Sequence, residues 1–510
     1  MAETFSVIDE VKRAAGTTVG ALFRQRAIIS PDRPAVEWDG HTLTFQELNA
    51  RVNRLANVLS SQSIERGDRL AIVSENRREY LEIELAAAKL GIIVACQNWR
   101  QSPEELKYCV SLVAPKLIFM SPRFREAVFN LQLEETPTIC LGEEYETLLE
   151  NSVDREPEIA AQAEDGLIIL YTSGTTGLPK AAVISHRAEI ARSMVNRADG
   201  SLFPDGAVVA WAPCFHMSST DKILGAAMQG TLSILLDGFN PEKIVEIIGR
   251  QRLGHLTLVP ATIGRVIAEL KRTGIKPKGI EVIGGMADLV PLDEIAEITS
   301  LLQAPFRNSF GSTETGSSPA SCGRIPIGVN PDNLSKQQNS YCELRLVDED
   351  DNEVAIGEVG EVTMRGPTLF SGYWDAPEAT AEAFRGGWYH MGDLMVRNAD
   401  GSVDFVDRRK YLIKSGGENI YPAEIERCLL SSPKIADAAV VRKPDQKWGE
   451  IPVVFVVRKD ESLIEQDVIE LCRGRIANYK LPKEVRFVTE EQVPRTANGK
   501  IKRAELEAML

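Results

Sequence analysis

The stretch from Tyr171 to Lys180 is the feature of this sequence that most restricts its fold. Its last eight residues, from Ser173 on, include three hydroxyl side chains, two glycines and one lysine. Glycines let backbone N–H groups approach an anion closely, and hydroxyls, turn amides and an ammonium group bind phosphate oxygens. The preceding apolar run, residues 167–170, is typical of a buried strand. Because ligands of α/β sheets bind at such strand ends, we predict a phosphate-binding loop in an α/β protein.

Two other interpretations of this stretch were weighed. In the P-loop of nucleoside triphosphatases, Gly-Lys-Ser/Thr leads directly into a helix. Here Pro179 precedes the lysine, and residues 181–185 indicate another short strand. The second alternative is a solvated hairpin loop with Lys180 on the surface, but hairpin loops of this length are uncommon. Both alternatives are therefore weaker than a ligand loop.

Length, charge and cysteine content exclude several classes of protein. The 510 residues are too many for one hydrophobic core, so two or more domains are expected. The net charge of −15 argues against a protein that binds nucleic acid or an anionic membrane. The eight cysteines form no Cys-x-x-Cys pair, so neither a zinc site nor a disulfide framework is indicated. Reduced thiols in a cytoplasmic protein are the expectation.

The sequence shows no signal for secretion and none for a membrane span. The first residues, from Met1 to Phe5, lack a basic region followed by an apolar run. No apolar run approaches the ~20 residues that a membrane-spanning helix needs. We predict a protein without a transmembrane segment.

Apolar periodicity predicts alternating strands and helices in the first part of the chain. Residues 35–44 indicate a hairpin with a tight Asp39-Gly40 turn. Thr44 and Glu47 form the capping box of the next helix. Further strands are expected at 70–73, 92–95, 116–120, 208–212, 232–236, 256–259, 280–283 and 306–310, with helices at 79–90, from Ser102 and at 241–250. Such alternation predicts parallel sheets with helices on both faces.

The pattern changes in the last third of the chain. From about residue 336, short strands at 342–347, 360–364 and 403–406 indicate a β-rich section. From about residue 411 a small α/β unit follows, with a helix at Pro422 and a last helix at 464–472. The predicted fold class is therefore α/β, with a large N-terminal domain of parallel-rich sheets and helices plus a β-rich section, followed by a small α/β C-terminal domain.

Six stretches, in order, resemble the motifs of the adenylate-forming superfamily, which includes acyl-CoA synthetases, peptide-synthetase adenylation domains and firefly luciferase. They are Tyr171–Lys180, Phe310–Glu314, Gly387–Leu394, Asp407–Lys414, Ser415–Glu426 and Pro494–Lys500. The match extends over nearly the whole chain. It implies an N-terminal AMP-binding domain of residues 1–409, a mobile C-terminal domain of residues 410–510 and a hinge at Lys410.

The resemblance implies a site for ATP and Mg²⁺. In the family, the loop from Thr172 to Lys180 holds the β- and γ-phosphates, and Glu314 with Thr175 binds the metal, a hard cation that prefers oxygen. Asp393 accepts hydrogen bonds from the ribose, Arg408 reaches ribose or phosphate, and Lys500 contacts the α-phosphate and the reacting carboxylate. The implied nucleotide-binding residues are Thr172, Ser173, Gly174, Thr175, Thr176, Gly177, Lys180, Gly284, Gly285, Met286, Ser309, Phe310, Gly311, Ser312, Thr313, Asp393, Arg408 and Lys500. Alone, Glu314, Asp393 and Lys500 would be ordinary surface charges.

The resemblance also implies a second step in which coenzyme A takes the acyl group. His216 would be an aromatic gate between the carboxylate site and the thiol tunnel, although a cap on a strand is an alternative role. The C-terminal domain would turn about Lys410 and bring Gly416 and Gly417 near the pantetheine, with Lys414 in the same cofactor-binding segment. The implied catalytic residues are Thr172, His216, Glu314 and Lys500.

These features predict an AMP-forming acyl-CoA synthetase. It would activate a carboxylic acid with ATP, release pyrophosphate, and transfer the acyl group to coenzyme A with release of AMP. The expected partners are a small-molecule carboxylic acid and coenzyme A, without nucleic acid, and a homodimer is left open. Two alternatives remain: a stand-alone adenylation enzyme that loads a carrier protein, and a non-catalytic ATP-binding protein. The joint presence of Lys180, Glu314, Asp393, Arg408 and Lys500 argues against the latter.

The sequence departs from the family pattern at four places. Met391 replaces a usual threonine, and Tyr411 replaces a frequent acidic residue after the hinge lysine. Residues 237–239 lack the basic residue that plant coumarate ligases have there for the CoA nucleotide, and residues 317–340 lack the usual glycine-rich pattern. Of these departures, the missing basic residue at 237–239 concerns the expected contacts to coenzyme A.

The acyl pocket has no readable motif. It is expected near residues 216–222, 256–262, 284–287 and 309–311, with 315–321 behind. Asp221 and Lys222 are unusual for a fatty-acyl tunnel, because buried charges are costly unless paired. They are expected to pair with each other or to face solvent; otherwise they indicate a polar or aromatic acid.

Overall fold

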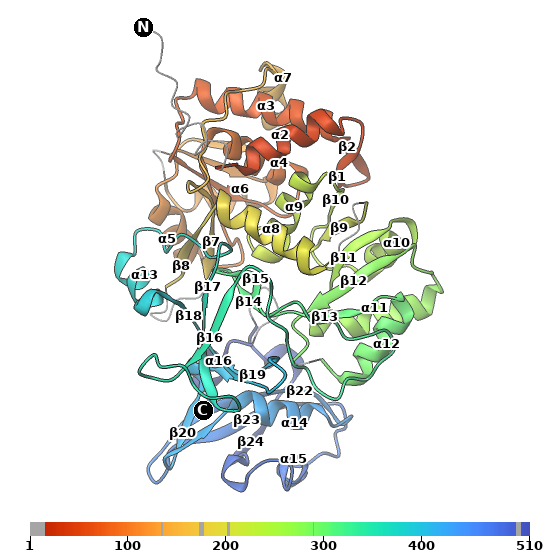
Figure 1. Ribbon diagram of the computed structural model, residues 1–510, viewed down its shortest axis with the longest axis vertical. Helices are drawn as coiled ribbons and strands as arrows, with labels where there is room; N and C mark the ends of the chain where they lie inside the picture. Colours follow the sequence, from red (N-terminus) through yellow and green to blue (C-terminus); the bar gives the residue numbers. More distant parts are fainter. Residues whose placement is uncertain (1–15, 134–135, 173–177, 201–204, 289, 496–500) are drawn as a thin grey trace.

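The computed structural model describes residues 16–133, 136–172, 178–200, 205–288, 290–495 and 501–510. Its strands and helices form a mixed α/β structure with parallel-rich sheets, a β-rich section and a separate C-terminal sheet, as predicted (Figure 1). Within the described part of the chain, no helix combines the length and the apolar character needed to cross a bilayer.

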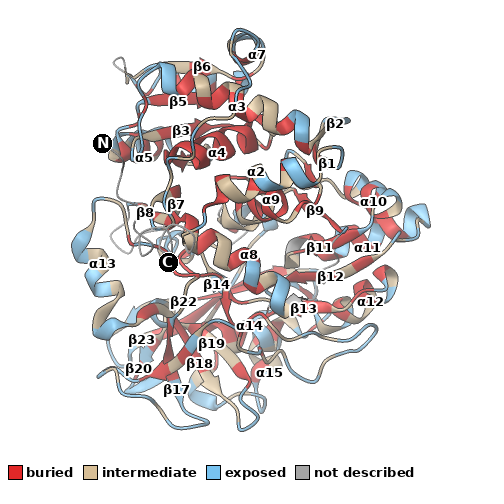
Figure 2. Ribbon diagram, turned by 45° about the horizontal axis from the view of Figure 1, so that its top comes forward, coloured by how far each residue is buried: buried red, intermediate tan, exposed pale blue. Residues whose placement is uncertain are grey.

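One six-stranded sheet lies in the part of the molecule at the top of Figure 2. In spatial order its strands are β6 (Thr138–Cys140), β5 (Leu117–Met120), β3 (Arg69–Val73), β4 (Ile93–Cys96), β7 (Gly166–Thr172) and β8 (Lys180–Ser185). Neighbouring strands are parallel except β7 and β8, which pair antiparallel. The central strands are short, apolar and buried, which is the pattern of a parallel sheet covered on both faces.

A seven-stranded sheet forms the right-hand part of Figure 1. In spatial order its strands are β13 (Phe306–Asn308), β12 (Ile280–Gly285), β11 (Leu253–Thr257), β9 (Ala207–Ala210), β10 (Ser233–Leu235), β1 (Pro34–Trp38) and β2 (His41–Thr44). All pairings are parallel except the β1–β2 hairpin, which was predicted from the Asp-Gly turn. The strand expected at 256–259 runs from Leu253 to Thr257 instead. It ends before residue 259 because Pro260 already starts a helix.

Helices cover both sheets. They are α2 (Val19–Ile29), α3 (Phe45–Ser61), α4 (Arg78–Leu90), α5 (Pro103–Val113), η1 (Pro122–Phe124), α6 (Arg125–Phe129), α7 (Glu143–Glu150), α8 (His186–Gly200), α9 (Met217–Gln229), α10 (Pro241–Arg250), α11 (Pro260–Thr273) and α12 (Leu292–Leu302). The predicted capping box of Thr44 and Glu47 is present, and α4 ends at Gly91 with a positive φ of 73°. Helices α8 and α9 pack on each other, α8 against β8 and α9 against β9 and β10, so the pair lies between the sheets.

The β-rich section follows the seven-stranded sheet. It contains a short hairpin, β14 (Gly311–Ser312) with β15 (Gly316–Pro319), and an antiparallel sheet of β16 (Glu343–Val347), β17 (Val359–Arg365), β18 (Tyr389–Arg397) and β19 (Val403–Arg408), with α13 (Pro377–Ala383) and η2 (Arg385–Gly387). Strands were predicted at three of these positions, and all three are confirmed.

The C-terminal sheet has its own hydrophobic core. Its strands are β20 (Ile413–Ser415), β21 (Glu418–Ile420), β22 (Ile435–Asp445), β23 (Gly449–Arg458) and β24 (Glu484–Phe487), and its helical segments are η3 (Arg409–Tyr411), α14 (Pro422–Leu430), α15 (Glu465–Cys472), η4 (Asn478–Lys480), η5 (Glu490–Gln492) and α16 (Arg503–Glu507). The prediction that the helix at 464–472 is the last one was wrong. Helix α16 has five residues, too few to show a period, and buried Leu506 with the Arg503–Glu426 ion pair fixes it.

Candidate active site

The predicted phosphate loop joins β7 to β8. Thr172 and Lys180 lie opposite each other in the last register position of this antiparallel pair. The predicted ligands Ser173, Gly174, Thr175, Thr176 and Gly177 lie outside the described residues. Although the loop connects a hairpin, the weaker interpretation of a surface lysine is wrong. Lys180 is half-buried, and its ammonium lies 4.9 Å from the centroid of the Tyr373 ring.

Glu314 shares this place with Lys180 through Tyr373. Its side chain is buried, at 8% exposure, in the turn between β14 and β15. The Tyr373 hydroxyl donates a hydrogen bond of 3.0 Å to Oε1 of Glu314. Burial, and then the neighbouring carboxylate, raise the pKa of Tyr373, so the phenol stays protonated and remains a donor. Among the described residues Oε2 has no hydrogen-bond partner, so it can take a cation.

Asp393 and Arg408 form the next part of the site. They are register partners on β18 and β19, and Nε of Arg408 lies 3.0 Å from Oδ1 of Asp393. The charge of Asp393 raises the pKa of Arg408 most strongly, and Glu314 adds to this effect, although burial opposes it. The carboxylates of Asp393 and Glu314 thus both raise the pKa of Arg408. This shared effect connects the predicted ribose-binding residue with the predicted magnesium-binding residue.

The glycine motifs at the ends of β12 and β13 lie side by side. Gly285 pairs with Asn308, and the amide of Ser309 donates to the carbonyl of Gly285 over 3.0 Å. A Cβ atom on Gly285 would lie 2.1 Å from the Leu258 carbonyl oxygen, so only glycine allows this approach. Met286 is 38% exposed and therefore open to a ligand.

The β14–β15 hairpin contains the rest of the motif from 309 to 313, and its two strands approach each other closely. A Cβ atom on Gly311 would lie 1.9 Å from the Gly316 carbonyl oxygen. The neighbouring residues Ser312 and Thr313 are half-buried, whereas the Phe310 ring is buried against Phe405. The motif from 309 to 313 is therefore held rigidly between the seven-stranded sheet and the β-rich section.

His216 acts as the cap of a helix, where a strand cap had been the alternative. Its ring Nδ1 accepts the amide of Ser218 at 3.2 Å, at the start of α9, and also contacts the Ser218 hydroxyl at 2.9 Å. The ring is half-buried, and the preceding Phe215 packs edge-on against Trp99. This geometry fixes the imidazole at one end of α9.

The predicted residues of the C-terminal part are not brought to the nucleotide motifs. Gly416 and Gly417 lie in the β20–β21 hairpin, with Gly416 against the Trp448 ring. Figure 1 shows β20 near the bottom of the molecule, whereas β7 and β8 lie near its middle. Lys414 is exposed, and the Lys410 ammonium lies 5.0 Å from the centroid of the Tyr411 ring. Lys500 lies outside the described residues.

The charges in the expected acyl region contradict one expectation. Asp221 and Lys222 neither pair with each other nor face open solvent. Asp221 lies 3.4 Å from Nη1 of Arg192 on α8, and the Lys222 ammonium hydrogen bonds the hydroxyl of Thr257 on β11. Neighbours on one helix cannot face each other, and each side chain finds its partner on a different element.

Sequence reasoning missed four residues of these sites: Tyr373, Arg192, His255 and Arg307. Tyr373 stands in Gly372-Tyr373-Trp374, and a glycine-flanked aromatic pair after a β-strand was a usable signal. Arg307 is a charged residue inside the strand predicted at 306–310, which was another. Nothing in the sequence could connect Arg192 with Asp221, since their contact depends on how α8 packs on α9.

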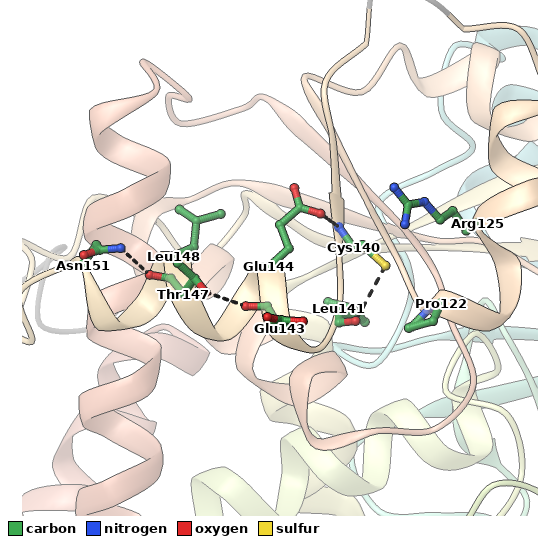
Figure 3. A pocket seen from close by; sticks show the side chains of 9 residues that line it. All are labelled: Pro122, Arg125, Cys140, Leu141, Glu143, Glu144, Thr147, Leu148 and Asn151. Atoms are coloured by element: carbon green, nitrogen blue, oxygen red, sulfur yellow. Dashed lines mark hydrogen bonds between the residues drawn. The ribbon is translucent and has the colours of Figure 1, made fainter.

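The hollow shown in Figure 3 lies elsewhere. It measures about 700 Å³ and is lined by residues of η1, α6, β6 and α7, none of them a predicted site residue. Its polar groups satisfy one another. The Cys140 amide donates to Glu144, Thr147 donates to the Glu143 carbonyl, and Asn151 donates to the Thr147 carbonyl. These contacts lie within α7 or between α7 and β6, and none of them joins this hollow to the nucleotide motifs.

The acids of the nucleotide motifs suit magnesium better than a transition metal. Among the described residues no group of three or more His, Cys, Asp or Glu side chains could hold a metal ion. Mg²⁺ needs no such group, because it binds through one or two carboxylates plus phosphate and water oxygens. The buried Glu314, with one oxygen still open, fits this requirement.

Comparison with known proteins identifies the family. The model of the AMP-binding enzyme family matches residues 23–374, and the model of its C-terminal domain matches residues 424–500. The chain belongs to the AMP-binding enzyme family. It is similar to an indoleacetate–CoA ligase of Aromatoleum aromaticum, with 32% identity over 95% of this chain and 97% of the relative.

Solved structures agree with this family. ATP-bound MatB from Rhodopseudomonas palustris has a TM-score of 0.85 and 27% identity, covering 97% of this chain and 99% of the other. An o-succinylbenzoate CoA synthetase from Bacillus subtilis, in complex with its acyl-adenylate intermediate, has a TM-score of 0.84 and 26% identity, covering 96% and 98%.

This AMP-binding enzyme is an AMP-forming acid–thiol ligase that activates a carboxylic acid as an acyl-adenylate and transfers it to coenzyme A. Its cofactors are ATP, Mg²⁺ and coenzyme A. The sequence predictions of family, fold, reaction class and cofactors are confirmed.

Proposed function

We propose that the side chains of Lys180, Glu314, Asp393 and Arg408 form the ATP site of this ligase. Lys180, with Thr172 and the loop between them, binds the β- and γ-phosphates. Glu314, together with Thr175, holds the magnesium ion, which neutralises charge on the phosphate oxygens when bound. The observation that carries this proposal is the Lys180–Tyr373–Glu314 contact beside the Asp393–Arg408 ion pair.

The remaining nucleotide contacts follow from the same arrangement. Asp393 accepts hydrogen bonds from the ribose, and Arg408 is held beside it to reach ribose or phosphate. Gly284, Gly285 and Met286 lie along the adenine, opposite the segment of residues 309–313. The tight backbone approach at Gly285 and Gly311 supports this assignment, because a flat base needs a surface without side chains.

We further propose that the chain divides into domains 1–409 and 410–510 and turns at Lys410. The sheet of the β-rich section ends at Arg408, the C-terminal sheet begins at Ile413, and only η3 joins them. Among the described residues, the polar contacts across the joint include the Ala423 amide donating to Asp407 at 2.7 Å, Arg427 donating to the Phe405 carbonyl at 3.0 Å, and an exposed Lys414–Glu349 ion pair of 3.9 Å. A cavity of about 660 Å³ opens beside them. A set of contacts this small can break when the C-terminal domain rotates and be replaced by others.

The arrangement described here suits the first half-reaction. Gly416 and Gly417 lie far from β7 and β8, as the second half-reaction would not allow (Figure 1). The good superposition on an ATP-bound relative supports the same assignment. Lys500 then acts at the α-phosphate, and after rotation Lys414, Gly416 and Gly417 bind the pantetheine, with His216 as the gate.

We propose a cytoplasmic location, which the eight free cysteines support, since thiols stay reduced there. No role in binding nucleic acid is proposed for this acidic chain. The homodimer stays a prediction, which size-exclusion chromatography with light scattering decides.

Replacing Glu314 by Gln tests the ATP site. A neutral amide is a poorer ligand for a hard cation, so we expect adenylation to fall on the order of 10- to 100-fold. The Mg²⁺ concentration for half-maximal rate should rise with it. Acid-dependent ATP–pyrophosphate exchange at varied Mg²⁺ measures both quantities. Glu378→Gln, an exposed acid on α13, is the matched control. An unchanged Mg²⁺ titration in Glu314→Gln removes this residue from the site.

A further inference from the structure

A cluster of polar side chains lies between helices α8 and α9 and one face of the seven-stranded sheet. We call it the acyl cluster: Asn196, Lys222, His255, Thr257 and Arg307. His255 and Thr257 are two residues apart on β11, so they point to the same face. Thr257 pairs with Gly284, and Gly284 pairs with Arg307, which puts the three residues in one row across β11, β12 and β13.

Gly284 makes room for the cluster. A Cβ atom at this position would lie 2.9 Å from Nε2 of His255 and 3.2 Å from Cβ of Arg307. The two cationic or basic side chains thus approach each other over a glycine that belongs to the adenine motif. The acyl cluster therefore borders the nucleotide site.

Two cations of the cluster have no carboxylate partner. Among the described residues, no carboxylate oxygen lies within 4.0 Å of a side-chain nitrogen of Lys222 or Arg307, whose partners are a hydroxyl and an amide. Arg307 is only 5% exposed; Nη1 donates to Asn196 over 3.2 Å, and the buried Nη2 has no partner. Nδ1 of His255 is also buried without a partner. Among the described residues, Nη2 of Arg307 is thus a buried donor without an acceptor, and Nδ1 of His255 is a buried polar atom without a partner.

The nearest acids do not complete the cluster. Asp221, beside Lys222 in the chain, contacts Arg192 instead, and burial raises its pKa. Burial also raises the pKa of Glu189 on α8 well above its ordinary value, which favours the neutral form of this carboxyl, although Arg192 opposes the shift. Burial and the neighbouring Arg307 lower the pKa of Lys222 to about 7, although Asp221 opposes this. Burial and Arg324 lower the pKa of Arg307 overall, although Asp199 and Glu281 act to raise it. Among the described residues, these acids act from a distance, and none forms an ion pair with Lys222 or Arg307.

Such an arrangement is costly in the free protein. A buried cation without a counter-charge loses hydration and gains nothing in return. A buried donor without a partner costs free energy as well. The cost is recovered when a bound anion supplies the missing acceptors. A site of this kind also rejects analogues that lack the anion, because its polar groups would then stay unpaired.

The position of the cluster sets the separation from the reacting carboxylate. Arg307 precedes Gly311 by four residues, which span at most roughly 13 Å at the rise of a strand. Lys222 follows His216 by six residues of helix, about 9 Å along its axis. The second charge of a ligand would thus lie several bonds from the end of the molecule that meets ATP.

We propose that the acid activated by this enzyme is a dicarboxylate, whose second carboxylate binds Lys222 and Arg307. The inference rests on the proposed function, because it assumes that the first carboxylate attacks the α-phosphorus of ATP and displaces pyrophosphate. The second carboxylate takes no part in bond making. It accepts hydrogen bonds from the two cations and holds the acid in register.

The experiment compares matched acids in ATP–pyrophosphate exchange. Straight-chain dicarboxylic acids of five to eight carbons are measured beside their monomethyl esters and the monocarboxylic acids of equal length. For at least one length we expect the wild type to prefer the diacid by 100-fold or more in kcat/KM. Lys222→Met should reduce this preference below tenfold through the KM of the diacid, and Lys222→Arg should keep most of it. Lys243→Met, on the exposed face of α10, is the control and should keep the full preference.

Folding is checked separately. Thermal unfolding of Lys222→Met and of a second variant, Arg307→Lys, shows whether each is native. In the native wild type, a diacid alone should raise the unfolding temperature, and its monomethyl ester should not.

Three results separate this inference from the proposed function. If the wild type adenylates an ester or a monocarboxylic acid as well as every diacid, the inference is overturned and the proposed function stands. If native Lys222→Met lowers activity on diacid and ester equally, Lys222 does not read the second charge and the inference also fails. If no acid of any class supports exchange, the proposed function itself fails, and the inference with it.

Discussion

The nucleotide site and the acyl cluster differ in how their charges are paired. At the nucleotide site Asp393 faces Arg408, and Glu314 accepts a hydrogen bond from the tyrosine that lies under Lys180. In the acyl cluster Lys222 and Arg307 lack any carboxylate partner among the described residues. The described charged groups of the first site contact partners within the protein, whereas the two cations of the second lack a counter-charge in contact with them.

This difference follows from what each site has to recognise. ATP is common to the whole family, and a prearranged set of paired charges binds it without reorganisation. The acid varies between members, so the residues that select it are not part of a shared motif. Pairing within the site therefore marks shared chemistry, and missing pairs mark the variable substrate.

The largest expected effect belongs to Lys500, on the shared side of the comparison. We expect Lys500→Ala to lower acyl-adenylate formation on the order of 10²- to 10³-fold, because one mobile cation at the α-phosphate is lost. Thioester formation from supplied acyl-adenylate should persist. Because the role is shared, the loss should be the same for a diacid and for its ester. Equal damage to both half-reactions would contradict this role.

The second effect concerns the joint between the domains. Proline fixes φ near −65° and removes a backbone donor, so Lys410→Pro should hold one orientation. We expect pyrophosphate exchange to survive and thioester yield from preformed adenylate to fall about 10²-fold or more. Wild-type rates in both assays would show that the rotation does not occur at residue 410. An intact first step in the wild type, without any transfer to coenzyme A, would favour the carrier-protein alternative.

The smallest effect is a pH dependence confined to the acyl cluster. With a pKa lowered to about 7 by burial and Arg307, Lys222 is charged below pH 7 and loses its proton above it. The KM of a diacid should therefore rise about tenfold between pH 6.5 and 8.5, while the KM of ATP changes little. A KM for the diacid that does not change with pH would contradict the role of Lys222 in binding the second carboxylate.

The other titratable groups around Lys222 have to be separated from the lysine in this profile. Burial lowers the pKa of His255 well below its ordinary value, so it stays neutral over this range. Burial lowers the pKa of Arg307 from its very high ordinary value, and a guanidinium keeps its proton over this range. Deprotonation of Asp221 or Glu189 with rising pH would act in the same direction, so Lys222→Met should flatten the profile if the lysine is responsible.

Much of the fold was predictable because its signals are local. The β1–β2 hairpin, the capping boxes and the glycine at the end of α4 are each encoded within a few residues. Helix α8 was not predicted, and its buried face explains why. It carries Glu189 and Arg192 toward the interior, which breaks the apolar period.

The two sites were predictable to different degrees for the same reason. Glu314, Asp393 and Lys180 stand in short motifs that can be read along the chain. His255 and Arg307 meet only through the register of three parallel strands, and Asp221 finds Arg192 on another helix. Contacts between residues so distant in sequence cannot be inferred without the packing of the elements that carry them.

Arg192 connects the two sites, with a consequence for how the specificity of this enzyme can diverge. Its guanidinium contacts Asp221 on one side and donates to the carbonyl of Thr313, the residue before Glu314, over 2.9 Å on the other. An evolving or engineered descendant can change its preferred acid at Lys222 and Arg307 while this brace stays in place. A substitution of Arg192 itself would disturb the metal-binding turn at the same time. Changes of substrate are therefore expected at Lys222 and Arg307, whereas Arg192 is expected to be retained.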